Sequence, residues 1–207
     1  GRAQGEADLV LAAIDQVCLL YPADRARVVV AGLSAGASLA ALLALRHPDR
    51  VAGVAMHSGV PPGTAHSMLS ALGAMRGRRA TAALPPSDAQ APSPQAVGAP
   101  GLLPPLLVIH GDADLMVDRR NGAAAVQAWA EAAGARAAAP RTVQRGKRRA
   151  MTVTDHRLRG RVVATLVEVA GLGHAWSGGA ARQPFSDPSG PDASRLIWAF
   201  ARRQFGR

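Results

Sequence analysis

Residues 28–50 read VVVAGLSAGASLAALLALRHPDR, and this stretch decides the fold. A short, buried-looking strand of three valines runs into Gly32-Leu33-Ser34-Ala35-Gly36, and a small, apolar helical run follows at once. A Gly-x-Ser-x-Gly pattern that ends a strand and opens a helix predicts a sharp turn with an exposed, strained serine. Its two glycines are expected to let strand and helix approach closely. We therefore interpret Ser34 as a nucleophile, with a simple small-residue turn as the alternative.

The helix expected at residues 35–47 begins directly behind this serine. Backbone N–H groups in the first turn of a helix have no partner within the helix and favour negative charge. The N–H of Ala35 is therefore predicted to be one donor to the oxyanion that forms when a serine attacks a carbonyl carbon.

Length and composition limit the possible classes of protein. The 207 residues, 48% of them hydrophobic, suit one domain with a sizeable core, and no apolar run is long enough to span a membrane. The single cysteine, Cys18, excludes an internal disulfide. The net charge of +10 comes almost entirely from Arg in an Ala- and Gly-rich chain, which is the pattern of a GC-rich genome. The densest basic run, residues 144–149, predicts a solvated hairpin loop, with an anion-binding patch as the alternative. No nucleic-acid partner is expected.

Apolar strands alternate with helices along the chain, and this order predicts a doubly wound, mostly parallel α/β sheet in a single domain over residues 1–207. Residues 58–103 hold seven of the fifteen prolines and predict a long irregular insertion near the active site, with one short helix at 67–75. The expected strands are 27–32, 51–57, 104–110, 150–156 and 161–169, and the expected helices are 6–21, 35–47, 122–133 and one that starts around 191.

Three predicted strand ends lead into reactive side chains, in the order Ser34, Asp114 and His174. Chemistry gathers at the carboxyl ends of parallel strands, and Ser-Asp-His is the chain order of the α/β-hydrolases. His174 lies in a glycine-rich loop that could fold over the serine, and is predicted to act as the general base. Asp114 is predicted to orient it, with Asp112 and Asp118 as alternatives.

The remaining candidates receive less specific interpretations. Trp176 is predicted to wall the substrate site, and packing is an equally good interpretation of it, whereas Trp129 is predicted to lie in the core. His110 is expected to pack or to bond its own loop. No cluster has the spacing of metal ligands, so neither a metal nor another cofactor is expected. The other histidines are interpreted as structural or exposed: His47, His57, His66 and His156.

Three segments of the chain resemble the esterase family that includes polyhydroxybutyrate depolymerases, feruloyl esterases and acetylxylan esterases. Residues 27–59 resemble its nucleophile segment, residues 106–122 its acid segment and residues 171–200 its histidine segment. The resemblance implies an α/β-hydrolase fold, an ester substrate and a secreted or periplasmic location. It also implies the triad Ser34, Asp114 and His174, the same residues that the strand ends indicate.

The chain departs from the family's pattern at its beginning. Family members have strands before the nucleophile strand, and a loop after one of them supplies a second oxyanion N–H. Residues 1–26 offer mainly one helix, so the N-terminal strands are expected to be missing, no second donor is identified, and an open strand edge invites association. The leading hypothesis is a serine carboxylesterase acting on a polyhydroxyalkanoate-type polyester or related ester. The alternatives are a catalytically inactive α/β-hydrolase fragment that serves as an interaction scaffold and an Arg-rich module that binds an anionic polymer.

Overall fold

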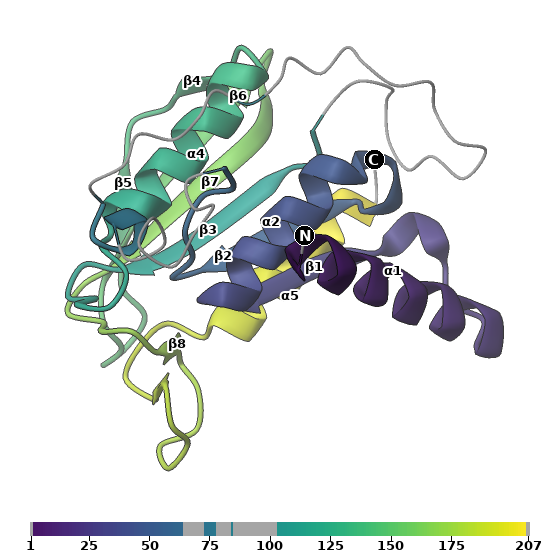
Figure 1. The fold of residues 1–207 in the computed structure, drawn as a ribbon. Helices are drawn as coiled ribbons and strands as arrows, with labels where there is room; N and C mark the ends of the chain where they lie inside the picture. Colours follow the sequence, from purple (N-terminus) through teal and green to yellow (C-terminus); the bar gives the residue numbers. More distant parts are fainter. Residues whose placement is uncertain (1, 64–72, 78–83, 85–102, 206–207) are drawn as a thin grey trace.

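The computed structural model describes residues 2–63, 73–77, 84 and 103–205. Its main feature is one sheet with the strand order β1-β2-β3-β7-β6-β4, in which β5 also pairs with β6 (Figure 1). Among the described residues, β1 pairs only with β2 and is therefore an edge of the sheet. The seven strands of this sheet are β1 (Val29–Leu33), β2 (Gly53–His57), β3 (Leu106–Gly111), β4 (Arg136–Ala137), β5 (Arg141–Val143), β6 (Met151–Leu158) and β7 (Arg161–Val169).

The first four strands of that order run parallel, so their carboxyl ends meet at one edge of the sheet. In register, Leu33 of β1 lies opposite His57 of β2, and His57 lies opposite Ile109 of β3. This parallel half confirms the predicted α/β-hydrolase sheet and places the ends of β1 and β3, and the start of the loop after β7, at the same edge.

The other half of the sheet is antiparallel and was only partly predicted. Strand β6 pairs antiparallel with β7, and the short strands β4 and β5 pair antiparallel with β6. The basic run 144–149 joins β5 to β6 and is thus a hairpin loop, as expected. Two of its arginines bind other parts of the chain: Arg148 donates to the Gly190 carbonyl at 2.7 Å, and Arg149 donates to the Asp187 carboxylate at 3.0 Å.

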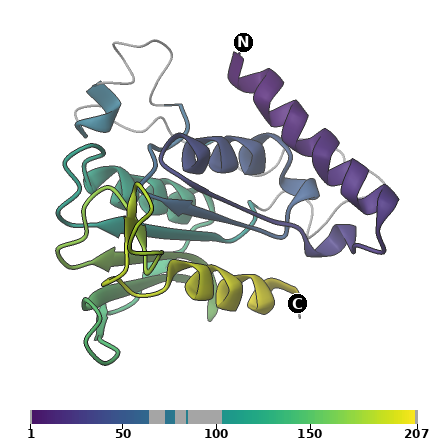
Figure 2. The same ribbon diagram turned by 90° about the horizontal axis from the view of Figure 1, so that it is seen from below.

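Helices cover both faces of the sheet, which is the doubly wound arrangement that the sequence predicts. Helices α2 (Ala35–Arg46) and α4 (Arg120–Ala132) lie on one face, and α5 (Ala193–Phe205) lies on the other (Figure 2). Helix α1 (Arg2–Leu20) packs against α2. Two short strands, β8 (Trp176–Ser177) and β9 (Ser186–Asp187), pair in the segment between β7 and α5.

Alternation along the central strands divides the core into two layers. Val54, Leu106 and Val108 face α2 and α4 and belong to one buried cluster, while Ala55 and Leu107 belong to the cluster under α5. Successive side chains of a strand point to opposite faces, so strands that are apolar throughout can fill both layers. Trp129 of α4 is 1% exposed and its indole N–H donates to the Pro104 carbonyl at 2.8 Å, which confirms its predicted place in the core.

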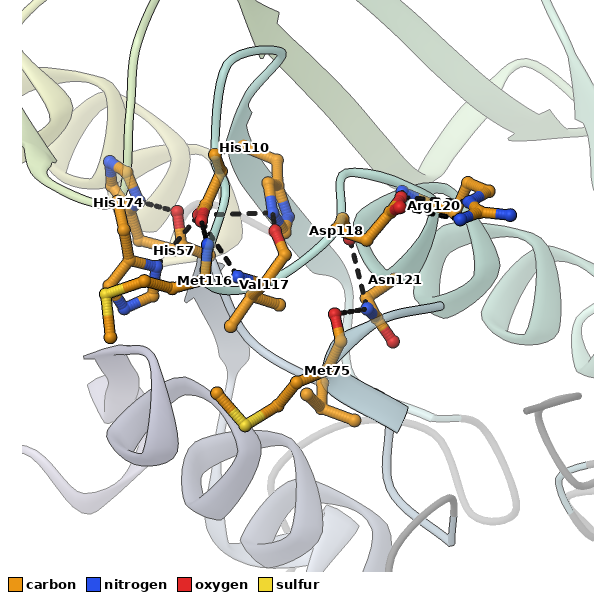
Figure 3. A network of polar contacts seen from close by, with 12 residues as sticks. His57, Met75, His110, Met116, Val117, Asp118, Arg120, Asn121 and His174 are labelled. Atoms are coloured by element: carbon orange, nitrogen blue, oxygen red, sulfur yellow. Dashed lines mark hydrogen bonds and ion pairs between the residues drawn. The ribbon is translucent and has the colours of Figure 1, made fainter. Parts of the chain in front are cut away.

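The predicted insertion lies largely outside the described residues. Of the expected helix at 67–75, only residues 73–75 are described, and they are helical. This stub is tied to the loop after β3, because the Asp118 N–H donates to the Met75 carbonyl at 2.7 Å and the Asn121 amide donates to the same oxygen at 3.3 Å (Figure 3). The described part of the insertion therefore contacts the loop that follows Asp114.

Candidate active site

The turn between β1 and α2 holds Ser34 in a strained backbone conformation. Its φ is 57° and its ψ is −120°, a combination that residues other than glycine rarely adopt. Hydrogen bonds on both sides hold the serine there. Its N–H donates to the His57 carbonyl at 2.8 Å, and its own carbonyl accepts from the N–H groups of Ala37 and Ser38. The predicted strain at this serine is present.

The two glycines of the motif differ in what they do. A Cβ on Gly32 would lie 2.2 Å from the carbonyl carbon of Gly36, so only glycine fits there. A Cβ on Gly36 would meet nothing within 4 Å. The prediction that both glycines are needed for close packing is therefore right for Gly32 and wrong for Gly36, because the helix presents its backbone to β1 at Gly36 and points the missing side chain away.

Asp114 is held in place by its own loop. One carboxylate oxygen, Oδ1, accepts the N–H groups of Met116 and Val117 at 2.9 and 2.8 Å, which closes a tight turn directly after β3. The other oxygen, Oδ2, accepts a hydrogen bond from Nδ1 of His174 at 2.8 Å (Figure 3). Nε2 of His110 lies 3.5 Å from the same oxygen. The carboxylate thus has partners for both oxygens.

These contacts keep Asp114 ionised. Burial alone would raise the pKa of this carboxyl, but the nearby His110 Nε2–H and the hydrogen bonds from the Val117 N–H and His174 outweigh burial and hold the pKa far below its usual range. An ionised carboxylate at Nδ1 of a histidine fixes the Nδ1–H tautomer and leaves Nε2 free to accept a proton.

His174 itself lies in the loop between β7 and β8, and further contacts hold this loop. The Trp176 N–H donates to the Phe185 carbonyl at 2.7 Å, and the Ser177 hydroxyl donates to the Pro191 carbonyl at 2.6 Å. The Phe185 ring meets the His174 imidazole edge-on, with 6.1 Å between ring centroids. The loop is therefore fastened on the C-terminal side of the histidine.

The alternative carboxylates contact other groups. Asp112 accepts the Gly171 N–H at 2.6 Å, and Asp118 pairs with the Arg120 guanidinium at 2.7 Å. In the part of the chain that the structure describes, neither of these carboxylates forms a hydrogen bond with His174.

Among the same residues, the Ser34 hydroxyl makes no hydrogen bond. Ala35 is the first residue of α2, so its N–H is among those that lack a partner within the helix.

Two buried histidines near the site were interpreted from sequence only as packing or structural residues. His110 is fully buried and its Nε2–H donates to the Val117 carbonyl at 2.9 Å, so it supports the loop that holds Asp114. His57 is fully buried and contacts both the serine turn and the histidine loop. The only sequence signal for either was its position at the carboxyl end of a strand.

Trp176 lies between the site and a surface groove. Its ring stacks on the His57 imidazole with 5.3 Å between centroids, and its indole N–H donates to the Ser194 hydroxyl at 3.2 Å. It also lines a groove between β1 and α5, together with Ala31 and Trp198.

The described residues contain no group of three or more His, Cys, Asp or Glu side chains placed to hold a metal ion. No helix among them combines the length and the apolar character that a bilayer crossing requires.

A mixed sheet with helices on both faces, and with Ser, Asp and His in loops at the carboxyl edge of its parallel half, is the α/β-hydrolase fold. Solved structures share it. An acetyl xylan esterase from Aspergillus awamori superposes with a TM-score of 0.62 at 20% identity, covering 81% of this chain and 61% of that one. SOBER1 of Arabidopsis thaliana superposes with a TM-score of 0.52 at 20% identity, covering 98% of this chain and 64% of that one.

The chain belongs to the Esterase PHB depolymerase family, whose profile matches residues 1–145. A poly(3-hydroxyalkanoate) depolymerase C of Paucimonas lemoignei is 40% identical over 74 residues, which are 36% of this chain. The chain spans 18% of the length of that depolymerase.

Proposed function

We propose that this chain is a serine carboxylesterase that hydrolyses esters through an acyl-enzyme on Ser34. The single observation that supports this most is the bond from His174 Nδ1 to the ionised Asp114, at the same sheet edge as a serine in a strained turn. Membership of an esterase family agrees with ester hydrolysis.

In the proposed reaction, His174 takes the proton of the Ser34 hydroxyl through Nε2 as Oγ attacks the ester carbonyl carbon. The Ala35 N–H stabilises the oxyanion, and Asp114 stabilises the imidazolium. His174 then gives its proton to the leaving alcohol. A water molecule, deprotonated in turn by His174, then attacks the acyl carbon. The bond from that carbon to Ser34 Oγ breaks, the acid leaves, and His174 returns its proton to Oγ.

The substrate class that we propose is a polyhydroxyalkanoate-type polyester or a related ester. The short match to a depolymerase supports it. We further propose that Trp176 forms a wall of the acyl or polymer site, because it joins the His174 loop to the groove beside β1. Trp176→Phe, which retains a ring over His57, is expected to raise KM for oligomeric 3-hydroxybutyrate esters more than KM for p-nitrophenyl acetate.

A catalytically inactive scaffold is not favoured. Binding through such a scaffold needs neither the strained backbone at Ser34, which costs stability, nor a buried, ionised carboxylate bonded to a histidine.

The test is hydrolysis of p-nitrophenyl acetate and butyrate by this chain beside Ser34→Ala. We expect turnover that disappears in the variant, together with labelling of the unchanged protein, but not of Ser34→Ala, by a fluorophosphonate. Equal background rates from two folded proteins would contradict the proposal. The rates of hydrolysis are then measured for polyester oligomers, feruloyl esters and acetylated xylan, in order to compare these substrate classes.

A further inference from the structure

His57 connects the two loops that supply the nucleophile and the base. It is the last residue of β2 and lies in register between β1 and β3. Its backbone carbonyl accepts the Ser34 N–H at 2.8 Å. The main chain of His57 therefore takes part in holding the nucleophile turn.

The side chain of the same residue reaches the histidine loop. The Ser177 N–H donates to Nε2 of His57 at 3.1 Å, across 120 residues of sequence. Because a backbone N–H can only donate, Nε2 must be unprotonated, and the proton of the neutral ring must be on Nδ1. Nδ1 lies 3.1 Å from the Ser58 hydroxyl, which can accept that proton's hydrogen bond. The contacts thus select one tautomer.

Burial agrees with a permanently neutral ring. The His57 side chain is fully buried, and burial, together with the nearby His110 and His174 imidazoles, lowers the pKa of His57 to about 3. A protonated ring would lose the bond from Ser177, because both nitrogens would then be donors.

The bond at Ser177 bears on His174, which lies three residues earlier in the same loop. The Ser177 hydroxyl also donates a hydrogen bond to the Pro191 carbonyl. Trp176, which lies between His174 and Ser177 in the chain, stacks on the His57 ring. A shift of about 1 Å in a reacting group can cost roughly 100-fold in rate. The position of this loop relative to the Ser34 turn therefore affects any proton transfer between His174 and Ser34.

We propose that His57 is a positioning residue: as a neutral acceptor for the Ser177 N–H, it fixes the position of the His174 loop relative to the Ser34 turn. The inference rests on the proposed ester hydrolysis. A purely structural histidine would fill space between the strands, so any side chain that fills the space and preserves stability would replace it. A positioning histidine needs an acceptor at Nε2.

The test compares His57→Leu, which removes both polar contacts at similar volume, with His57→Gln, which retains an acceptor oxygen and an N–H donor. His156→Ala is the matched control, because His156 lies on β6 and has no contact with the site. Thermal unfolding and near-ultraviolet circular dichroism establish that each variant is folded. We measure kcat and KM for p-nitrophenyl acetate and butyrate, and the rate of fluorophosphonate labelling.

We expect kcat and the labelling rate to fall roughly 10- to 100-fold in His57→Leu with KM changed less than threefold, and to recover most of that loss in His57→Gln. His156→Ala should have the same kcat and labelling rate as the protein without a substitution. A folded His57→Leu with kcat within threefold of the unchanged protein would overturn the inference. Equal losses in His57→Leu and His57→Gln would overturn it as well, since retaining the acceptor would then have no effect.

Nitrogen-15 NMR of the imidazoles tests the same inference without activity. It should show His57 as the neutral Nδ1–H tautomer at pH 6, and a downfield His174 Nδ1 proton that weakens in His57→Leu and returns in His57→Gln. A protonated His57, its other tautomer, or an unchanged His174 signal in His57→Leu would refute positioning. If the unchanged protein neither hydrolyses esters nor reacts with the fluorophosphonate, the proposed function fails, and these spectra still decide the role of His57.

Discussion

Nδ1 of His174 lies 2.8 Å from Oδ2 of Asp114, although 60 residues separate them in the chain. Both residues follow strands of the parallel half of the sheet, β7 and β3, which are hydrogen-bonded neighbours. Adjacent parallel strands deliver their following loops to the same edge, so the distance in sequence becomes contact in space.

Replacing Asp114 by Asn should lower kcat by roughly 10³- to 10⁴-fold, because the amide no longer stabilises an imidazolium and can turn its NH₂ group toward His174. KM should change little. Asp112→Asn is the matched control, since an Asn oxygen can still accept the Gly171 N–H that Asp112 accepts now. Steady-state kinetics on both variants make the comparison. A loss of kcat that is larger in Asp112→Asn would assign the orienting role to the other carboxylate.

His110→Leu should weaken both the fold and the reaction. It leaves the Val117 carbonyl without its donor in a buried place, which costs about 1–3 kcal/mol in the free energy of unfolding. It also removes one of the groups that keep Asp114 ionised. Urea unfolding and kcat measure the two effects. His110→Gln, which retains an N–H donor, should recover part of both, and an unaffected kcat in a destabilised His110→Leu would limit His110 to structural support.

Alanine at the two motif glycines should have opposite consequences for stability. Gly32→Ala places a methyl group inside the backbone of Gly36, so we expect a loss of several kcal/mol or no folded protein. Gly36→Ala puts its methyl group into open space within a helix, and should be neutral or stabilising by up to about 1 kcal/mol. Denaturant unfolding of both variants checks this. Similar losses would mean that the turn is not packed through Gly32.

Stability should fall as the pH drops from about 6.5 toward 4.5. The unfolded chain binds a proton at His57 near pKa 6.5, while the folded chain resists it until about pH 3, so acid favours unfolding throughout that interval. The slope from one such group is at most about 1.4 kcal/mol per pH unit. His156, whose pKa burial also lowers, adds a smaller effect of the same sign. Urea unfolding across this range should show the slope in His156→Ala and lose most of it in His57→Gln. An equal slope in His57→Gln would contradict a neutral His57.

Much of the site could be predicted from local sequence. The turn at Ser34 follows from a glycine motif between a strand and a helix, and the Asp114 turn closes with main-chain groups only two and three residues away. Periodicity placed the main helices and the parallel strands, with boundary differences such as α1 beginning at Arg2 rather than near residue 6. The short strands β4, β5, β8 and β9 were missed, because segments of two or three residues have no periodicity to read.

The amino-acid order by itself determined that a serine would stand in a strained turn, because the residues that impose it are neighbours in the chain. It also determined which residue types end the strands. Only the tertiary structure decided which carboxylate bonds His174, because Asp112, Asp114 and Asp118 lie within one loop and differ in the direction that the turn gives them. It likewise decided the tautomer of His57, because the Ser177 N–H that selects it comes from a distant part of the chain. The unequal roles of Gly32 and Gly36 depend on how the strand and the helix pack across the turn.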